Sequence, residues 1–341
     1  MRRRQLLGTA AGLALGVACG THLTVPVHLR RIGMLSTGAA VGPDEPIYAA
    51  FREEMSAEGF IEGSDYEVIY RFGVSDPNLL QRWARELANA GTDVIVASST
   101  GATQAARFAT SVIPIVMVAS HDPVEAGVVA NLAAPGGNVT GQSLAGGTLM
   151  PAQLDLLQQI APVRRLAYLS PSFPSPGQGY PSVTDIFQRS LLNAASARGI
   201  DVTVPPVRDI GDIAAVLAKL ADERLDAVFV IESPAWLVPG TRLPMNEVVD
   251  FAVRRRLLSI SGLRRYAEAG LLVSYGDARS MPDLHRGAAR YVAQILHGAT
   301  PGSLAIDTPK TFELVINAKT ASAIGRDIPQ HLIDRAAFVI R

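Results

Sequence analysis

Short apolar runs alternate along this chain with longer stretches in which apolar residues recur at helical spacing. In the segment 93–97 the apolar run is unbroken after Asp93, and the small and hydroxylated residues of 98–103 follow it. This pattern is typical of a strand buried on both faces of a parallel sheet, with a helix beginning after it. Because the first N–H groups of a helix have no intrahelical partners, this strand end is a candidate site for a polar ligand. The alternative is that Thr100 only caps the helix.

The same pattern occurs twice. Each copy has the order strand, helix, strand, helix, strand, helix, strand. The segments of the first copy are 31–36, 48–59, 65–70, 77–89, 93–97 and 115–118, and those of the second are 165–170, 186–199, 201–205, 213–222, 226–230 and 258–260. Parallel strands need helical crossovers that cover both faces of the sheet. The sequence therefore predicts an α/β fold with two doubly wound lobes.

The C-terminal part predicts a return to the first lobe. Residues 281–296 have the spacing of an amphipathic helix that Gly298 ends, and residues 311–316 predict a last strand. Several crossings of this kind would join the lobes through a multi-strand hinge. We expect lobe 1 to comprise residues 29–141 and 277–300, and lobe 2 to comprise residues 142–276 and 301–341.

The first nineteen residues have the features of an export signal. Three arginines precede an apolar run, residues 6–18, that is shorter than the roughly 20 residues a membrane-spanning helix needs. Residues 3–7 resemble a twin-arginine signal, although the preceding Ser or Thr is absent. Cys19 stands where a bacterial lipoprotein carries its lipidated cysteine, but Gly16 replaces the usual Leu. Lipidation of Cys19 and simple cleavage near it both remain open, as does the export route.

Composition argues against several functional classes. The chain has 31 basic and 31 acidic residues and no basic stripe, so we expect no nucleic-acid partner. Its one cysteine permits no intramolecular disulfide. The six histidines show no paired metal-ligand spacing. The sequence has no glycine-rich phosphate loop, because its glycine-rich tract belongs to the export signal. We therefore expect neither a metal nor another cofactor.

A set of motifs carries a family resemblance. The most specific is Ala-Ala-Pro-Gly-Gly-Asn-Val-Thr-Gly at residues 133–141. The others are His121-Asp122-Pro123, Arg31-Ile32-Gly33, residues 59–63, Glu268-Ala269-Gly270-Leu271 and residues 311–317. Together they resemble the ABC-transporter substrate-binding family that includes tryptophan/tyrosine-type receptors, from about Arg31 to the C-terminus.

This resemblance implies a type I periplasmic-binding-protein fold, with two Rossmann-like lobes that close on a small molecule. It implies an ABC permease and ATPase as partners and a location in the periplasm or on the outer face of the cytoplasmic membrane of a bacterium. We expect a monomer whose membrane contact, if any, is a lipid anchor, and a ligand that is amino-acid-like or a small aromatic carboxylate. The chain departs from the family pattern at residues 170–176 and at Glu232-Ser233-Pro234, so the ligand of a relative does not transfer directly.

Ligands of doubly wound sheets bind outside the carboxyl ends of the strands. Asp122 also precedes a proline, which predicts the start of a helix that its carboxylate caps. The candidate ligand-binding residues at predicted strand ends are Ser36, Thr37, Ser98, Ser99, Thr100, Thr103, Ser120, Asp122, Ser170, Ser172, Glu232, Ser233, Gly262 and Tyr275.

Two other functions are compatible with parts of the sequence. Residues 141–145, Gly-Gln-Ser-Leu-Ala, resemble a nucleophile elbow with Ser143 as the nucleophile of a serine hydrolase. No oxyanion stretch or ordered triad follows it, so we expect a receptor with no catalytic residues. The third function is a ligand-sensing module that presents its closed form to a signalling partner, which needs the same two lobes.

Overall fold

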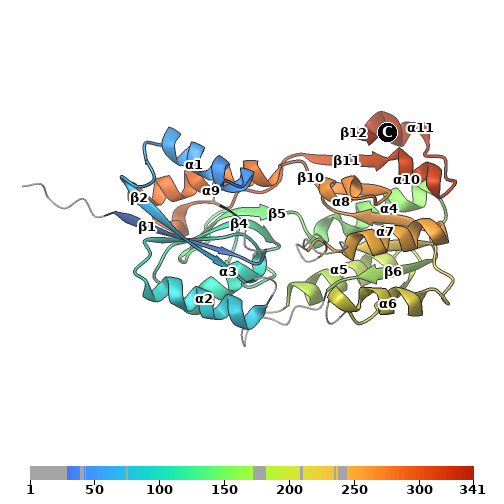
Figure 1. Ribbon diagram of the computed structural model, residues 1–341, viewed down its shortest axis with the longest axis horizontal. Coiled ribbons are helices and arrows are strands. Elements are labelled where there is room, and N and C mark those ends of the chain that lie inside the picture. Colours follow the sequence, from blue (N-terminus) through green and yellow to red (C-terminus); the bar gives the residue numbers. More distant parts are fainter. Residues whose placement is uncertain are drawn as a thin grey trace, which may run out of the picture.

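The computed structural model describes residues 29–38, 42, 44–73, 76–171, 182–207, 210–233, 236 and 244–341. The predicted export signal, Cys19 and Ser172 lie outside these residues. Within them the chain forms two sheets that stand side by side along the long axis of the molecule (Figure 1). The prediction of two doubly wound lobes is confirmed.

Lobe 1 is built on a five-stranded parallel sheet in the order β2-β1-β3-β4-β5. Helix α1 packs against α9 on one face, and α2 packs against α3 on the other (Figure 1). The elements are β1 (Arg30–Ser36), α1 (Pro46–Ala57), β2 (Tyr66–Phe72), α2 (Pro77–Asn89), β3 (Val94–Ala97), α3 (Thr100–Ala109), β4 (Ile115–His121), β5 (Val139–Leu144) and α9 (Met281–Leu296).

Lobe 2 has a seven-stranded sheet in the order β12-β11-β10-β9-β8-β6-β7, in which only β10 and β11 pair antiparallel. Apolar side chains of α4, α5, α10 and α11 fill one face, and those of α6, α7 and α8 fill the other. The strands are β6 (Arg165–Leu169), β7 (Asp201–Thr203), β8 (Ala227–Val230), β9 (Leu258–Ser261), β10 (Val273–Asp277), β11 (Phe312–Asn317) and β12 (Phe338–Ile340). The helices are η1 (Gly147–Leu149), α4 (Met150–Ile160), α5 (Val183–Ser196), η2 (Ile210–Asp212), α6 (Ile213–Leu220), α7 (Pro244–Arg255), α8 (Arg264–Glu268), α10 (Ala318–Ala323) and α11 (Gln330–Arg335). The short helix η4 (Pro301–Ser303) instead packs against lobe 1, beside β5 and the loop before it.

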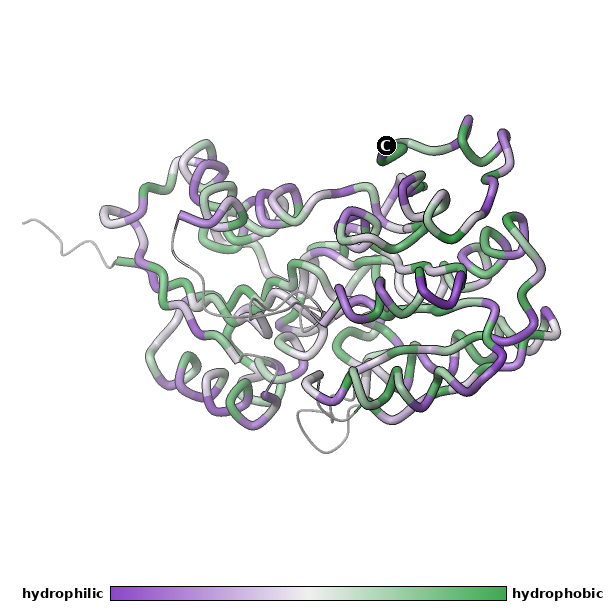
Figure 2. The backbone as a smooth tube through the Cα atoms, turned by 45° about the vertical axis from the view of Figure 1, so that its right-hand side comes forward, coloured by the Kyte–Doolittle hydropathy of each residue, from purple (hydrophilic) through white to green (hydrophobic). Residues whose placement is uncertain are grey.

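Hydrophobic burial explains why these segments fold as they do. Strands β3 and β8 are buried along their whole length, as expected for strands covered by helices on both faces. Figure 2 shows the hydrophobic stretches along the strands within each lobe, whereas the helices alternate between hydrophobic and hydrophilic positions. Burial of its apolar face against the sheet thus supplies most of the stability of each helix.

Two local predictions around β4 are wrong. No helix follows Asp122-Pro123, because residues 123–127 form turns and the φ angle of Asp122 is 41°. Thr100 does not cap α3, since Ser99 holds that position and accepts a hydrogen bond from the N–H of Ala102. In both places a tertiary contact, described below, uses the side chain that local sequence rules assigned to a cap.

Three segments cross between the lobes: residues 143–147 from the end of β5, residues 277–280 from the end of β10, and residues 304–312 up to the start of β11. We call these three segments the hinge. On the lobe 1 side, the N–H of Ser143 donates to the carbonyl of Asp307 at 2.8 Å, and the N–H of Asp307 donates to the carbonyl of Gly141 at 2.9 Å. On the lobe 2 side, the N–H of Ala278 donates to the carbonyl of Thr311 at 3.2 Å.

Candidate functional site

The strand ends of lobe 1 carry a cluster of hydroxyls that bond to one another and to nearby backbone groups. Thr37 Oγ1 donates to Ser99 Oγ at 3.3 Å, and Thr103 Oγ1 donates to the carbonyl of Ser99 at 2.8 Å. Ser98 Oγ lies 3.4 Å from the carbonyl of Leu35, and Ser36 Oγ accepts from the N–H of Gly38. These hydroxyls fix the loops that follow β1 and β3.

Thr100 holds the end of β4 in place. Its Oγ1 accepts from the N–H of His121 at 2.8 Å and lies 3.4 Å from Ser120 Oγ. Both Thr100 and Ser120 are buried. This contact between the first turn of α3 and the last residues of β4 fixes the backbone of His121, and it explains why the Thr100 hydroxyl is not used as a cap.

Asp122 lies next to this strand end and reaches the hinge. Its Oδ2 accepts from the N–H of Gly147, the first residue of η1, at 2.8 Å. Burial raises the pKa of the Asp122 carboxyl, although this hydrogen bond opposes the shift. The residue therefore connects the end of β4 with the crossing that leads into lobe 2.

Lobe 2 places Glu232 after β8, against the backbone of Gly262 after β9. A Cβ atom at position 262 would lie 1.3 Å from Glu232 Oε1, so the present position of the carboxylate requires glycine there. The neighbouring Ser233 is fixed by Tyr266, whose hydroxyl accepts from its N–H at 2.8 Å and donates to its carbonyl at 2.9 Å.

The two lobes meet directly at these strand ends. His121 Nε2 of lobe 1 lies 3.3 Å from Glu232 Oε2 of lobe 2, and both side chains are almost buried. The ring of Phe187 on α5 packs edge-on against the His121 ring, with centroids 4.9 Å apart. We call His121, Asp122, Phe187, Glu232 and Gly262 the interlobe junction. The strand ends of the two lobes are therefore in direct contact at this junction.

Burial dominates the electrostatics of the junction. It lowers the pKa of His121 to about 4, and the Asp277 carboxylate opposes part of that shift. It raises the pKa of Glu232 to about 7; the Arg265 guanidinium opposes this shift, and the carboxylates of Asp277 and Asp122 add to it. Burial therefore favours the uncharged form of His121 at neutral pH, and Glu232 keeps its proton to a higher pH than an exposed carboxyl does.

These shifts predict the pH dependence of stability. The Glu232 pKa is raised from 4.5, so its contribution is complete below pH 4.5 and is lost as the pH rises through about 7. The His121 pKa is lowered from 6.5, so its contribution is complete above pH 6.5 and is lost as the pH falls through about 4. Between pH 4.5 and 6.5 the two contributions therefore change the unfolding free energy in opposite directions as the pH rises.

Single replacements should separate these slopes. When the pH falls from 6.5 to 4, we expect the unfolding free energy of Glu232→Gln to decrease by on the order of 1–3 kcal/mol relative to that of the parent. The reason is that only the loss of stability from His121 protonation remains in this variant. His121→Gln should lose a similar amount between pH 4.5 and 7. Urea unfolding across this pH range measures both slopes, and equal pH profiles for the two variants would contradict the assignment.

Several buried polar atoms near this edge of lobe 2 have no hydrogen-bond partner. Ser261 Oγ and Ser274 Oγ lie on the neighbouring strands β9 and β10, at paired register positions. His121 Nδ1 and Arg265 Nε are unpaired in the same way. Because buried polar groups are nearly always paired, this concentration marks the strand ends as a place where a ligand can bind.

The remaining predicted positions, Ser170 and Tyr275, do not join the junction through a described contact, and Tyr275 lies in the middle of β10 instead of at its end. Ser170 is buried after β6. The ring of Tyr275 packs against Phe312, with centroids 6.2 Å apart, and its carbonyl accepts from Gln153 Nε2 at 2.8 Å. Sequence reasoning missed His121 and Phe187 as site residues. The position of His121 directly after Ser120 is a local signal, whereas Phe187 lies within a helix and gives none.

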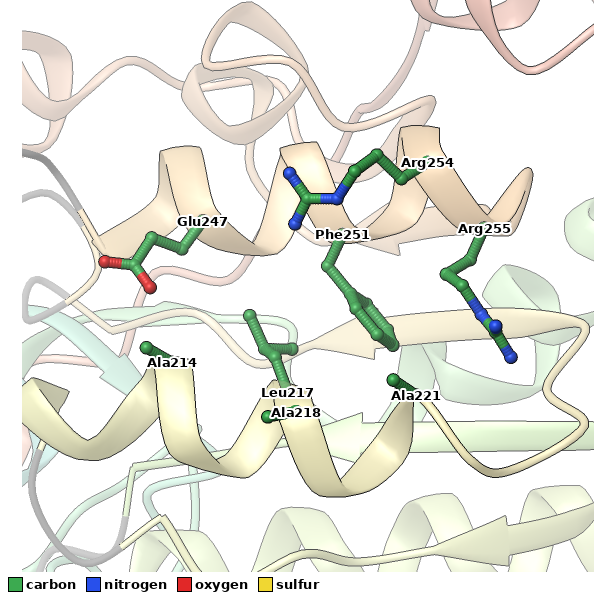
Figure 3. A pocket seen from close by; sticks show the side chains of 8 residues that line it. All are labelled: Ala214, Leu217, Ala218, Ala221, Glu247, Phe251, Arg254 and Arg255. Atoms are coloured by element: carbon green, nitrogen blue, oxygen red, sulfur yellow. The ribbon is translucent and has the colours of Figure 1, made fainter.

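A groove elsewhere in lobe 2 is separate from the junction. It has a volume of about 270 Å³ and lies between α6 and α7 (Figure 3). Its lining residues are Ala214, Leu217, Ala218, Ala221, Glu247, Phe251, Arg254 and Arg255. None of them belongs to the interlobe junction.

Two further properties bear on the kind of site this is. In the part of the chain that the structure describes, no three His, Cys, Asp or Glu side chains are grouped so that they could hold a metal ion. No helix among the described residues is long and apolar enough to span a membrane.

Ser143 lies inside β5, and its Oγ donates to the carbonyl of Leu144 at 3.0 Å. It therefore does not occupy the strand-to-helix turn of a nucleophile elbow.

Comparisons with known proteins agree with this geometry. The curated tyrosine-binding protein of Clostridioides difficile (strain R20291) is 25% identical over 278 residues, which cover 80% of this chain and 75% of the relative. The ABC domain from Streptococcus pneumonia, solved in complex with L-Trp, has a TM-score of 0.76 and 24% sequence identity, over 92% of this chain and 100% of that chain. A conserved domain protein from Vibrio cholerae has a TM-score of 0.78 and 24% identity, over 91% and 99% of the two chains.

The structural likenesses show that the fold is that of a type I periplasmic binding protein, as predicted. The family model described as ABC transporter substrate binding protein matches residues 44–340, which is most of the chain. This is a family of solute-binding receptors. The chain therefore belongs to the ABC transporter substrate-binding protein family.

Proposed function

We propose that this receptor captures a small amino-acid-like or aromatic carboxylate ligand between its lobes and delivers it to an ABC importer without altering it. The observation that carries the proposal is the contact between His121 and Glu232, which joins the strand ends of the two lobes. Ligands of doubly wound sheets bind at such strand ends, and lobe closure around a ligand is a common transition. The tyrosine and L-Trp in the names of two relatives agree with this ligand class.

The charges at the junction favour an amino acid over a simple carboxylate. Asp122 and Glu232 both have raised pKa values, and the carboxylates of Asp122 and Asp277 raise that of Glu232 further. A buried carboxylate is costly unless a cation or hydrogen-bond donors accompany it. The protonated amine of an amino acid would supply both. The unpaired serine hydroxyls on β9 and β10 are close enough in the sheet to serve its carboxylate or ring substituent.

A matched pair of ligands tests this choice. At a concentration about 100-fold above the dissociation constant, L-tyrosine should raise the melting temperature by about 5 °C. The compound 3-(4-hydroxyphenyl)propanoate, which lacks only the amine, should give a much smaller shift. Differential scanning fluorimetry with both, and with L-tryptophan, measures this. Equal shifts for the two matched compounds would show that the carboxylates do not select an amine.

The remaining features complete the proposed role. Residues 1–19 would direct export to the periplasm or the outer face of the cytoplasmic membrane, with Cys19 as the point of any lipid anchor. The receptor would act as a monomer and dock on an ABC permease coupled to an ATPase. The two moving bodies would be lobe 1, predicted as residues 29–141 and 277–300, and lobe 2, predicted as residues 142–276 and 301–341. Residues 142–144 and 301–307 would move with lobe 1, because they pair with its strand β4 and with its loops. Mass spectrometry of the mature protein purified from its host would identify the cleavage site and any copurified ligand.

Two other functions make different predictions. A sensing module would bind the same ligand but act on a signalling partner, and neighbouring genes for a sensor kinase in place of a permease and ATPase would favour it. A serine hydrolase would lose activity on Ser143→Ala. We expect no ester hydrolysis by the parent protein, because the Ser143 hydroxyl is buried and bonded to a backbone carbonyl.

A further inference from the structure

Arg279 lies within the hinge and contacts all three crossing segments. Its guanidinium binds the Asp277 carboxylate through Nε, at 3.1 Å to each oxygen, and through Nη2, at 2.6 Å to Oδ2. Nη1 donates to Asp307 Oδ2 at 2.9 Å, and Nη2 donates to the carbonyl of Ser143 at 2.7 Å. One side chain therefore joins the first, second and third crossings.

These bonds connect the two halves of the hinge. Ser143 and Asp307 pair with each other through the backbone on the lobe 1 side. Asp277 ends β10 in the lobe 2 sheet, where it lies opposite Phe312. Arg279 is thus placed where the three segments change from the pairing of one lobe to the pairing of the other. The planar guanidinium fixes the direction of each bond, which a single ammonium group does not.

We propose that Arg279 is the pin of the hinge, which holds the three crossing segments together so that the lobes turn about one axis between open and closed forms. This role rests on the proposed function of a receptor that closes on its ligand. It makes Arg279 a positioning residue, because it acts through the hinge and does not contact the interlobe junction. Hinges absorb backbone rotation in a few residues at the ends of elements, and residues 144–147, 278–280 and 308–311 lie at such ends.

Arg279 has a second effect, on charge. The Asp277 side chain that it covers is 1% exposed. The negative charge of Asp277 raises the pKa of both His121 and Glu232, so it acts on the junction from the end of β10. Arg279 pairs with this carboxylate, whereas Arg265 from α8 opposes the shift at Glu232 and Asp122 adds to it. Removal of the guanidinium should therefore raise the pKa of His121.

The test measures the spread of lobe orientations without any ligand. Spin labels are attached to cysteines that replace Val112 in lobe 1 and Lys219 in lobe 2, both exposed, in a chain with Cys19→Ser. Double electron–electron resonance then gives the distribution of interlobe distances. We expect Arg279→Gln to broaden this distribution about twofold, since the segments can then move independently. An unchanged width would overturn the proposal.

Two further variants distinguish the hydrogen bonds of Arg279 to the hinge from the effect of its positive charge. Arg279→Lys keeps the positive charge beside Asp277 but loses the planar guanidinium and its directed hydrogen bonds. It should therefore broaden the distance distribution. The His121 pKa, measured by NMR, should stay near that of the parent. Asp307→Asn removes only one link and should broaden the distribution less, which keeps the proposal testable if Arg279→Gln folds poorly. If Arg279→Lys restores the parent width, the residue acts through charge alone and the pin is excluded.

A matched control comes from the same chain. Arg290 on α9 pairs with Glu54 on α1 at 2.8 Å, entirely within lobe 1, so Arg290→Gln should leave the width unchanged. Addition of L-tyrosine forms a separate arm of the experiment. If L-tyrosine does not shift the parent distance, the proposed ligand fails, whereas the comparison of widths without ligand still decides the role of Arg279.

Discussion

Gly262→Ala should weaken amino-acid binding about 100-fold while the protein remains folded. The added Cβ would lie 1.3 Å from Glu232 Oε1 and 2.5 Å from its carboxyl carbon, so the carboxylate must leave its place. The carboxylate is the outer end of a side chain with rotatable bonds, so it can turn away from the added methyl group. This movement breaks the contact with His121 without moving a strand. Isothermal titration calorimetry with L-tyrosine measures the loss of affinity, and circular dichroism checks the fold.

A control for this change is Gly137→Ala. Its added Cβ would meet nothing closer than Arg107 Nη1 at 3.5 Å, which is an ordinary contact, and the site lies in the loop before β5. We expect affinity and stability close to those of the parent. Retention of full affinity by Gly262→Ala would show that the position of Glu232 does not matter for binding, and the proposed site would then be wrong.

The largest effect on stability is expected at Gly141, where β5 begins to approach the hinge. Its φ angle is 120°, and a Cβ there would lie 2.2 Å from the carbonyl oxygen of Met117 and 2.7 Å from its nitrogen. Both atoms belong to the backbone of β4, which cannot move without breaking the sheet. We therefore expect Gly141→Ala to lower the unfolding free energy by at least about 3 kcal/mol. Urea unfolding at pH 6 measures it.

Gly137→Ala serves as the control here too, because it adds the same methyl group near the same strand without a clash. The loss should appear in the unfolding midpoint of lobe 1 and in the yield of folded protein. A change of less than about 1 kcal/mol for Gly141→Ala would mean that β4 and β5 can separate at little cost. The description of β5 as a fixed strand leading into the hinge would then be incorrect.

The architecture of this chain could be predicted from sequence because its signals are local and repeated. Helices α2 and α9 have the predicted bounds, 77–89 and 281–296, since each has a strong apolar face and a proline near its start. The fully buried strands β3 and β8 were predicted within one residue at each end. Two successive copies of one pattern then determine two lobes, because parallel strands require the crossovers between them.

The residues that join the lobes could not be predicted in the same way. Asp122 and Thr100 have strong local preferences for helix caps, and contacts from Gly147 and His121 override them. Phe187 and Arg279 reach their partners only after distant segments have packed together, so no spacing in the sequence marks them. The candidate positions at strand ends follow from the topology, whereas the choice of Glu232 and His121 among them depends on how closely the lobes approach.

The proposed function requires above all that an amino acid binds between the lobes at Glu232. Isothermal titration calorimetry of the mature protein with L-tyrosine and L-tryptophan, beside the Gly262→Ala variant, tests this directly. We predict one site per chain with a dissociation constant of about 1 μM for at least one of the two, and a loss of about 100-fold in the variant. No saturable binding of either amino acid, or equal affinity in the variant, would contradict the account.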